Sequence, residues 1–296
     1  MKNRTKKHAD AAWEKALRIG REQALEVIGR RSAARARRAA TPAGLLLAEG
    51  DSWFDYPFHD VLEELEEGFG YEVESVAHRG DTLEEMAYAP MQLDAFFKKI
   101  RRLAEAGRVP KVILLSGGGN DIAGEEFPIL LNHRRSGHPV LNDGVMGGLI
   151  DAWLRFAMVS LAKSVTDLCV QGFSRCLPIL VHGYDFPVPD GRGFLGGSWF
   201  LPGPWLEPGF RKKGYDRLDE NTKVMKSIID RFNNTLRSVA GGSRLEHVHY
   251  VNLRETLSHR LEGEVYKTSW GNEIHPTKQG FKKLARRFHN VIRTVS

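Results

Sequence analysis

The stretch that decides the fold is residues 44–55, which reads GLLLAEGDSWFD. Its apolar run has the length of a buried strand, and the run breaks at Gly50 and Asp51. We therefore predict that Ser52 lies where a strand turns toward a helix that begins near His59. Reactive groups collect at the carboxyl ends of strands in open α/β sheets, so Ser52 occupies a position suited to a nucleophile.

Strand and helix patterns alternate along the rest of the chain. The further predicted strands are residues 71–77, 111–116, 178–181 and 247–253. The predicted helices are residues 60–68, 82–106 with an interruption at Pro90, 145–171, 218–240 and 275–294. Each parallel connection needs a crossover, so this alternation predicts an α/β fold: a three-layer α/β/α sandwich around a parallel sheet of about five strands.

The distribution of charge separates the first 40 residues from the rest of the chain. Residues 1–40 hold 12 Lys and Arg against 4 Asp and Glu, whereas the remaining 256 residues hold 31 against 33. We predict that residues 1–42 form a basic amphipathic helical arm and that residues 43–296 form one domain. A helix docked on the domain and a contact with nucleic acid or another acidic partner both remain open for the arm.

Composition also bounds the compartment and the cofactors. The two cysteines, Cys169 and Cys176, indicate core residues in a reducing compartment rather than a disulfide framework or a zinc site. No apolar stretch of signal-peptide length follows the basic start, and no run long enough to span a bilayer is predicted. The expectation is a cytoplasmic protein without a metal or another cofactor, of unknown oligomeric state.

Four loops at one edge of the predicted sheet carry the parts of an acyl-transfer site. Ser52 would attack the carbonyl, and His275 would take its proton and return it to the leaving group. The N–H groups of Ser52 and Gly80, with the side-chain amide of Asn120, would hold the oxyanion. Gly117 to Gly119 would let the backbone approach a ligand closely.

This set of residues resembles the signature of the SGNH (GDSL-type) hydrolase family. Gly50-Asp51-Ser52 looks like the first block of the family, Gly80 the second, Gly118 to Asp121 the third and His275 the last. The resemblance implies a flavodoxin-like hydrolase fold and a serine esterase that acts without a metal. Its substrate would be a small-molecule, lipid or carbohydrate ester, cleaved through an acyl-enzyme on Ser52.

Two positions depart from the family pattern. His78 stands where the second block usually has an asparagine, and Asn272 stands where the last block usually has an aspartate three residues before the histidine. The aspartate orients the imidazole and stabilises its cation, and an amide can do only the first. We predict a Ser-His dyad in which a main-chain carbonyl near Asn272 holds His275.

Several further residues are candidates for supporting or substrate-binding roles. Asp51 is expected to bind loop backbone, and both substrate contact and loop structure remain open for His182 and Asp185. The irregular aromatic segment 186–210 is expected to form one wall of the substrate pocket, with Trp199 and Trp205 as its main side chains.

Two alternatives to an esterase remain open. The first is a non-catalytic acyl- or carbohydrate-binding protein that keeps the hydrolase fold, and Asn272 is its only support in the sequence. The second is a hydrolase that its basic arm tethers to a polyanion.

Overall fold

The computed structural model describes residues 18, 21, 25, 42–194 and 202–295. The chain divides into two units, Met1–Ala43 and Gly44–Ser296, and the elements discussed below belong to the second. Almost all of the predicted arm, residues 1–42, lies outside the described residues, and so does Trp199. The arm therefore stays a prediction.

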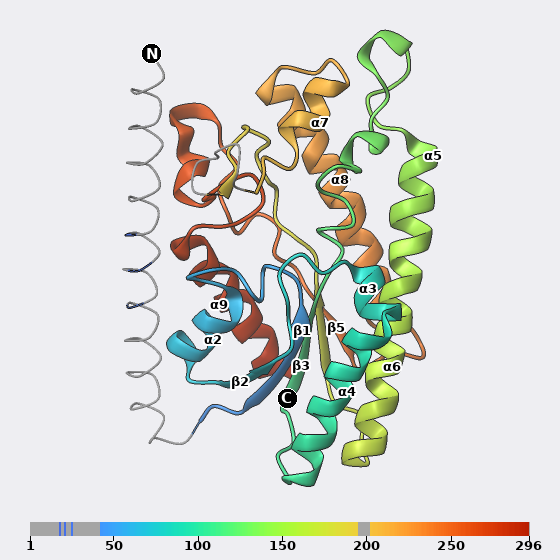
Figure 1. The fold of residues 1–296 in the computed structure, drawn as a ribbon, viewed down its shortest axis with the longest axis vertical. Helices are drawn as coiled ribbons and strands as arrows, with labels where there is room; N and C mark the ends of the chain where they lie inside the picture. Colours follow the sequence, from blue (N-terminus) through green and yellow to red (C-terminus); the bar gives the residue numbers. More distant parts are fainter. Residues whose placement is uncertain (1–17, 19–20, 22–24, 26–41, 195–201, 296) are drawn as a thin grey trace, which may run out of the picture. The chain divides into compact units, whose positions relative to one another are not determined.

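A parallel sheet of five strands forms the centre of the fold, in the order β2-β1-β3-β4-β5 (Figure 1). The strands are β1 (Leu45–Gly50), β2 (Glu72–Ser75), β3 (Val112–Ser116), β4 (Ile179–His182) and β5 (Val248–Val251). All five predicted strands are present. Their order is that of a flavodoxin-like doubly wound sheet.

Helices cover both faces of the sheet (Figure 1). α2 (Val61–Phe69) and α9 (Lys278–Val295) pack together on one face. The other face carries α3 (Leu83–Tyr88), α4 (Pro90–Glu105), α6 (Arg155–Phe173) and α8 (Leu218–Val239). Shorter helical segments are η1 (Phe127–Leu130), η2 (Arg134–Ser136), α5 (Asp143–Met146), η3 (Gly147–Leu154), α7 (Glu207–Lys212) and η5 (Glu262–Thr268). The predicted three-layer fold is confirmed.

Local sequence signals set several helix ends. Asp60 caps α2 by accepting a hydrogen bond from the N–H of Glu63 at 2.8 Å. Thr82 and Glu85 form a capping box at the start of α3. Pro90 begins α4 directly after α3 ends, as expected of a residue that cannot donate within a helix. The segment 186–210, predicted to be irregular, contains the start of α7 instead.

The helical stretch Asp143–Phe173 corrects one prediction. With a mean hydropathy of 1.4 over its best window, it is long and apolar enough to span a bilayer by length and composition alone. Core helices of soluble proteins have the same length and composition, and α6 packs against α3, α4 and α8.

The prediction that both cysteines are core residues is only half right. Cys169 is buried in α6, whereas Cys176 is exposed.

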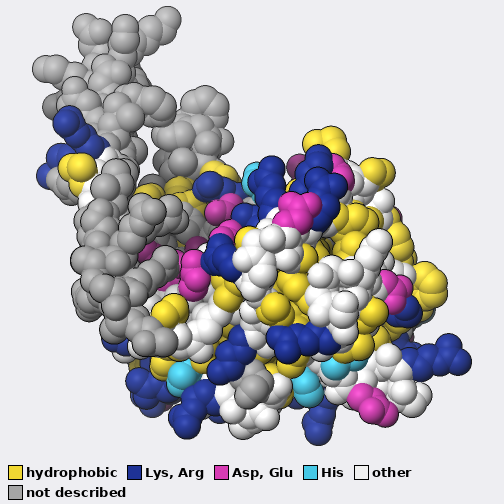
Figure 2. Space-filling view, turned by 90° about the horizontal axis from the view of Figure 1, so that it is seen from below, with side chains coloured by type: hydrophobic (Ala, Val, Ile, Leu, Met, Phe, Trp, Pro, Cys, Tyr) yellow, Lys and Arg dark blue, Asp and Glu magenta, His cyan; other side chains and the backbone are white. Residues whose placement is uncertain are grey.

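Charged side chains of both signs are mixed on the surface. On the face that Figure 2 shows, Lys and Arg side chains lie among acidic and apolar ones. This mixing agrees with the near-neutral composition of residues 41–296, which hold 31 Lys and Arg against 33 Asp and Glu.

The sheet has its switch point between β1 and β3. From β1 the chain crosses over one face through α2, and from β3 it crosses over the other face through α6. A crevice forms where two such connections diverge, and ligands of doubly wound sheets bind there. Ser52 lies two residues beyond β1 and Asn120 four residues beyond β3, so both lie at this point.

Candidate active site

Ser52 and His275 meet although 223 residues separate them in the sequence. The Nε2 atom of His275 lies 2.8 Å from the Oγ atom of Ser52. Their loops lie far apart in the sequence, one after β1 and the other before α9. The arrangement permits the imidazole to accept the hydroxyl proton, which is the first step that activates a serine.

The turn that holds Ser52 depends on a glycine at position 50. A Cβ atom at Gly50 would lie 2.6 Å from Cβ of Ser116 and 2.8 Å from its carbonyl oxygen, so a larger residue would push β1 away from β3. The ladder continues one residue beyond β1, where the N–H of Asp51 donates to the Ser116 carbonyl at 3.1 Å. The chain then turns, because the N–H groups of Phe54 and Asp55 both donate to the Asp51 carbonyl.

The Asp51 side chain has the structural role that the sequence predicted. Its Oδ1 atom accepts from the Trp53 N–H at 2.9 Å and from the Ser116 hydroxyl at 2.8 Å. Its Oδ2 atom accepts a short hydrogen bond from the Tyr184 hydroxyl, which in turn accepts from the Gly119 N–H at 3.1 Å. Asp51 therefore ties together the loops that follow β1, β3 and β4.

The group that orients His275 is the Asn272 side chain, and the predicted main-chain carbonyl is wrong. Oδ1 of Asn272 lies 3.1 Å from Nδ1 of His275. The same oxygen accepts from the N–H groups of Ile274 at 3.1 Å and His275 at 2.8 Å. Two main-chain donors on one atom identify it as the amide oxygen, so the imidazole carries its proton on Nδ1 and presents a bare Nε2 to Ser52.

Burial keeps the His275 imidazole neutral. Desolvation lowers its pKa to about 3, because the side chain is only 5% exposed and the charged form loses its water. The Tyr56 ring stacks on the imidazole, with centroids 4.1 Å apart and planes inclined by 19°. The Trp205 ring lies nearly perpendicular to it at 5.3 Å.

The predicted oxyanion donors lie in loops that are tied to one another. The Asn120 amide nitrogen donates to the carbonyl of Asp81 at 2.8 Å, which links the loops after β3 and β2. The N–H of His78 donates to the Gly50 carbonyl at 2.9 Å and holds the Gly80 loop beside the end of β1. Within residues 42–194 and 202–295, the N–H groups of Ser52 and Gly80 have no protein acceptor, so both are available to a ligand.

The three glycines after β3 serve close packing within the protein. A Cβ atom would lie 2.2 Å from the Met86 side chain at Gly117 and 2.4 Å from the Phe232 ring at Gly118. Gly118 also has a φ of +102°, which favours glycine. The prediction that these glycines admit a ligand is therefore not supported at these two positions.

His182 and Asp185 are structural. His182 belongs to β4, is 0% exposed, and packs against the rings of Trp53 and Phe54, so it cannot touch a substrate. The Asp185 carboxylate accepts four main-chain hydrogen bonds of 2.6–2.9 Å, from residues 186, 255, 256 and 257. Asp185 is one of the residues that line the pocket described below, and its carboxylate holds the loop after β5.

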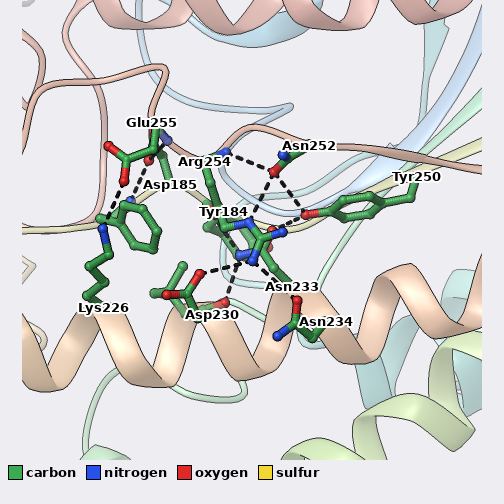
Figure 3. A network of polar contacts seen from close by, with 12 residues as sticks. Tyr184, Asp185, Lys226, Asp230, Asn233, Asn234, Tyr250, Asn252, Arg254 and Glu255 are labelled. Atoms are coloured by element: carbon green, nitrogen blue, oxygen red, sulfur yellow. Dashed lines mark hydrogen bonds and ion pairs between the residues drawn. The ribbon is translucent and has the colours of Figure 1, made fainter.

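A polar network supports this loop from α8 (Figure 3). Arg254 donates to Asp230 at 2.9 Å, to Asn252 at 3.1 Å and to Asn234 at 3.3 Å. Buried Asn233 donates to the Tyr184 carbonyl at 2.9 Å. The loops after β4 and β5 are therefore anchored to one helix.

Glu273 is a site residue that the sequence reasoning missed. It is 0% exposed, and its carboxylate accepts from the N–H groups of Gly191, Trp205, Leu206 and Glu207 at 2.6–3.0 Å. Burial still raises the pKa of this carboxyl, while these four hydrogen bonds act in the opposite direction. The only signal in the sequence was its position beside Asn272. Glu273 fixes the start of α7 to the loop of His275.

A pocket of about 50 Å³ opens beside Ser52 and extends toward α8. Its lining includes apolar and aromatic side chains from several parts of the chain: Trp53, Ile122 and Ala123, Tyr184, Pro187, Leu206, Met225 and Ile229, and Trp270 and Ile274. Leu206 and Pro187 belong to the predicted aromatic wall. Trp205 contributes to the site through His275, and Trp199 lies outside the described residues.

Metal ligation has no support in the described part of the chain. Among those residues, no three His, Cys, Asp or Glu side chains are grouped as metal ligands would be. The Nε2 atom of His247 lies 2.7 Å from the Thr166 hydroxyl on α6.

The comparisons with known proteins give distant structural likenesses. No protein-family model and no curated protein sequence matches the chain. One similar solved structure is LAE5, an α/β hydrolase from the metagenome of Lake Arreo, with 15% identity, a TM-score of 0.45, and coverage of 86% of this chain and 97% of that one. Another is the psychrotrophic esterase EstA from Pseudoalteromonas, with 12% identity, a TM-score of 0.42, and coverage of 85% and 97%.

A third similar structure is described as a lipolytic protein of the G-D-S-L family from Desulfitobacterium hafniense. Its identity is 13%, its TM-score is 0.41, and the match covers 84% of this chain and 99% of that one. Identities and TM-scores this low transfer no residue role from these proteins to this chain.

Proposed function

We propose that the protein is a serine ester hydrolase that forms an acyl-enzyme on Ser52. The observation that carries the proposal is the relay from the Ser52 hydroxyl through His275 to the Asn272 amide oxygen, with distances of 2.8 Å and 3.1 Å. A hydroxyl so paired with a buried neutral imidazole has the activation that a serine nucleophile needs.

The reaction follows from these contacts. His275 takes the Ser52 proton on Nε2 while Oγ forms a bond to the ester carbonyl carbon. The carbonyl oxygen becomes an oxyanion, for which the N–H groups of Ser52 and Gly80 and the free amide hydrogen of Asn120 are the donors. His275 then gives the proton to the leaving alcohol, and water repeats the sequence to release the acid.

The pocket beside Ser52 indicates a short acyl group. The pocket is small, with a volume of about 50 Å³. Its lining offers apolar side chains and no free charge, which suits an alkyl chain. Acetyl to butyryl esters are therefore the proposed substrates.

The first test is a series of p-nitrophenyl esters from acetate to decanoate, with a fluorophosphonate probe as a label for an activated serine. We expect hydrolysis to be fastest at two to four carbons and the intact protein to be labelled. Failure of both hydrolysis and labelling would leave the fold without this function.

Shortening Ile229 on α8 is expected to move the preference toward longer acyl chains. Ile229 lines the pocket, so Ile229→Ala should raise kcat/KM for hexanoate relative to acetate by about tenfold, the effect of one or two methylenes in an apolar site. The matched control is Ile228→Ala, because Ile228 is buried on the same helix but does not line the pocket. Identical profiles for both variants would mean that the acyl chain lies elsewhere.

Replacing Asn272 by aspartate is expected to raise kcat/KM about 5- to 30-fold at pH 8. The amide already orients His275, so the gain comes from the stronger hydrogen bond between a carboxylate and the imidazolium, about 1–2 kcal/mol. The pKa of His275, now about 3, should rise. The native rate should therefore stay flat from pH 5 to pH 8, whereas the variant should lose activity as the pH falls toward 5.

Profiles of kcat/KM from pH 4 to pH 9 measure both effects. Asn234→Asp is the control, since it adds the same charge on the exposed side of α8. A rate unchanged by aspartate at 272 would mean that the hydrogen bond to Nδ1 of His275 does not limit catalysis.

A further inference from the structure

The Tyr56 ring stacks on one face of the His275 imidazole. The contacts of His275 with Ser52 and Asn272 use the nitrogens at the edge of that ring. The two rings are nearly parallel, with centroids 4.1 Å apart. The Tyr56 ring is itself held by Phe194 and Phe281, whose centroids are each 6.0 Å away. Four residues beyond Ser52, Tyr56 thus brings an aromatic face to the base.

The imidazolium formed during the reaction has no carboxylate partner within the described residues. Asn272 supplies a neutral oxygen, and the nearby Glu273 carboxylate is occupied by four main-chain N–H groups. Deep burial makes a positive charge costly unless another group compensates it. Compensation by the described part of the protein must therefore come from a group other than a carboxylate.

An aromatic face can compensate a cation. Its quadrupole places negative charge above the ring plane, and a cation stacked there is stabilised, more strongly where water is excluded. The Tyr56 hydroxyl also accepts from the Asn272 amide nitrogen at 3.1 Å. Burial raises the pKa of that hydroxyl to about 12, so the ring stays neutral at working pH.

We propose that Tyr56 is a positioning residue whose ring face stabilises the His275 imidazolium in the transition state, in place of the carboxylate that Asn272 lacks. The inference rests on the proposed function, because the imidazolium forms only when Ser52 transfers its proton. The Tyr56 hydroxyl accepts from Asn272, and packing against Phe194 and Phe281 holds the ring over the imidazole. Stabilisation of a charge that exists only in the transition state raises kcat and leaves KM unchanged.

The test is a graded change of the ring face at constant shape. Tyr56 is replaced by phenylalanine and then by mono-, di- and trifluorophenylalanine, which weaken the quadrupole stepwise. Phenylalanine keeps the stack, so Tyr56→Phe should cost less than about threefold in kcat. From phenylalanine to the trifluoro analogue, kcat for p-nitrophenyl acetate should fall about 5- to 30-fold in even logarithmic steps, the range expected of a buried cation–π contact.

Two controls separate this role from packing. The same fluorinated series at Phe281, which contacts Tyr56 but has no ring contact with His275 among the described residues, should leave kcat flat. In an Asn272→Asp background, the slope at position 56 should shrink at least threefold, because a carboxylate then carries the compensation. A flat series at position 56, or equal slopes in both backgrounds, would overturn the proposal.

Failure of this proposal is distinguishable from failure of the proposed function. If Ser52 is labelled and the esters are hydrolysed while the series at 56 is flat, only the role of Tyr56 is lost. If Ser52 is not labelled and no ester is hydrolysed, the function itself is wrong, and Tyr56 then has no imidazolium to stabilise.

Discussion

Replacing Ser52 by alanine is expected to lower ester turnover by about 10⁴-fold or more and to abolish labelling by a fluorophosphonate. The alanine leaves His275 without a proton to accept, so no acyl-enzyme forms. The fold should survive, because the turn is held by main-chain hydrogen bonds to Asp51 and by the Asp51 side chain. Steady-state rates, mass spectrometry of the labelled protein and a thermal melt measure the three outcomes.

Ser227→Ala is the matched control for this substitution. Ser227 is an exposed serine on α8 whose hydroxyl donates within the helix to Lys223 at 3.2 Å. Its loss should change neither rate nor labelling. Persistent labelling of Ser52→Ala would assign the nucleophile to another residue. An intact protein that binds esters but never turns them over would instead favour the non-catalytic binding protein.

Replacing Asn120 by alanine is expected to lower kcat by about 10²- to 10³-fold, the usual effect of one lost oxyanion donor. KM should change little, since the donor acts on charge that develops in the transition state. The alanine also removes the hydrogen bond to the Asp81 carbonyl, which should cost about 1 kcal/mol of folding free energy. Rates and unfolding curves measured on one preparation separate the two effects.

Asn142→Ala provides the comparison for Asn120. Asn142 caps α5 away from the pocket by accepting from the Val145 N–H at 3.2 Å, and its loss should cost about 1 kcal/mol of stability without a change in rate. Equal rates in both variants would remove Asn120 from the site.

Patterns that repeat along the chain made the fold and the Ser52–His275 pair predictable. Apolar runs of strand length gave all five strands, and the breaks after them placed Ser52 and Asn120 at one edge. Topology brings the loops after these strands to one edge, and the resemblance of four blocks to a hydrolase signature selected His275.

Contacts that depend on side-chain rotation could not be predicted in this way. Asn272 lies three residues before His275, and only the side-chain torsion decides whether its amide or a carbonyl faces the imidazole. The Tyr56 ring meets His275 across more than two hundred residues with no periodic signal. The sequence placed the end of the fourth strand at residue 181, which put His182 in the loop beyond it. The strand includes His182 and buries it.

The carboxylate of Glu273 binds only main-chain N–H groups at the start of α7, so the side chains there are free to vary. The donors at positions 205–207 are main-chain N–H groups, which every amino acid except proline has. Prolines occur at positions 202, 204 and 208, next to these donors but never on them. These hydrogen bonds therefore do not depend on which side chains occupy positions 205–207. Substitutions at these positions can change the substrate preference while the segment keeps its position relative to His275.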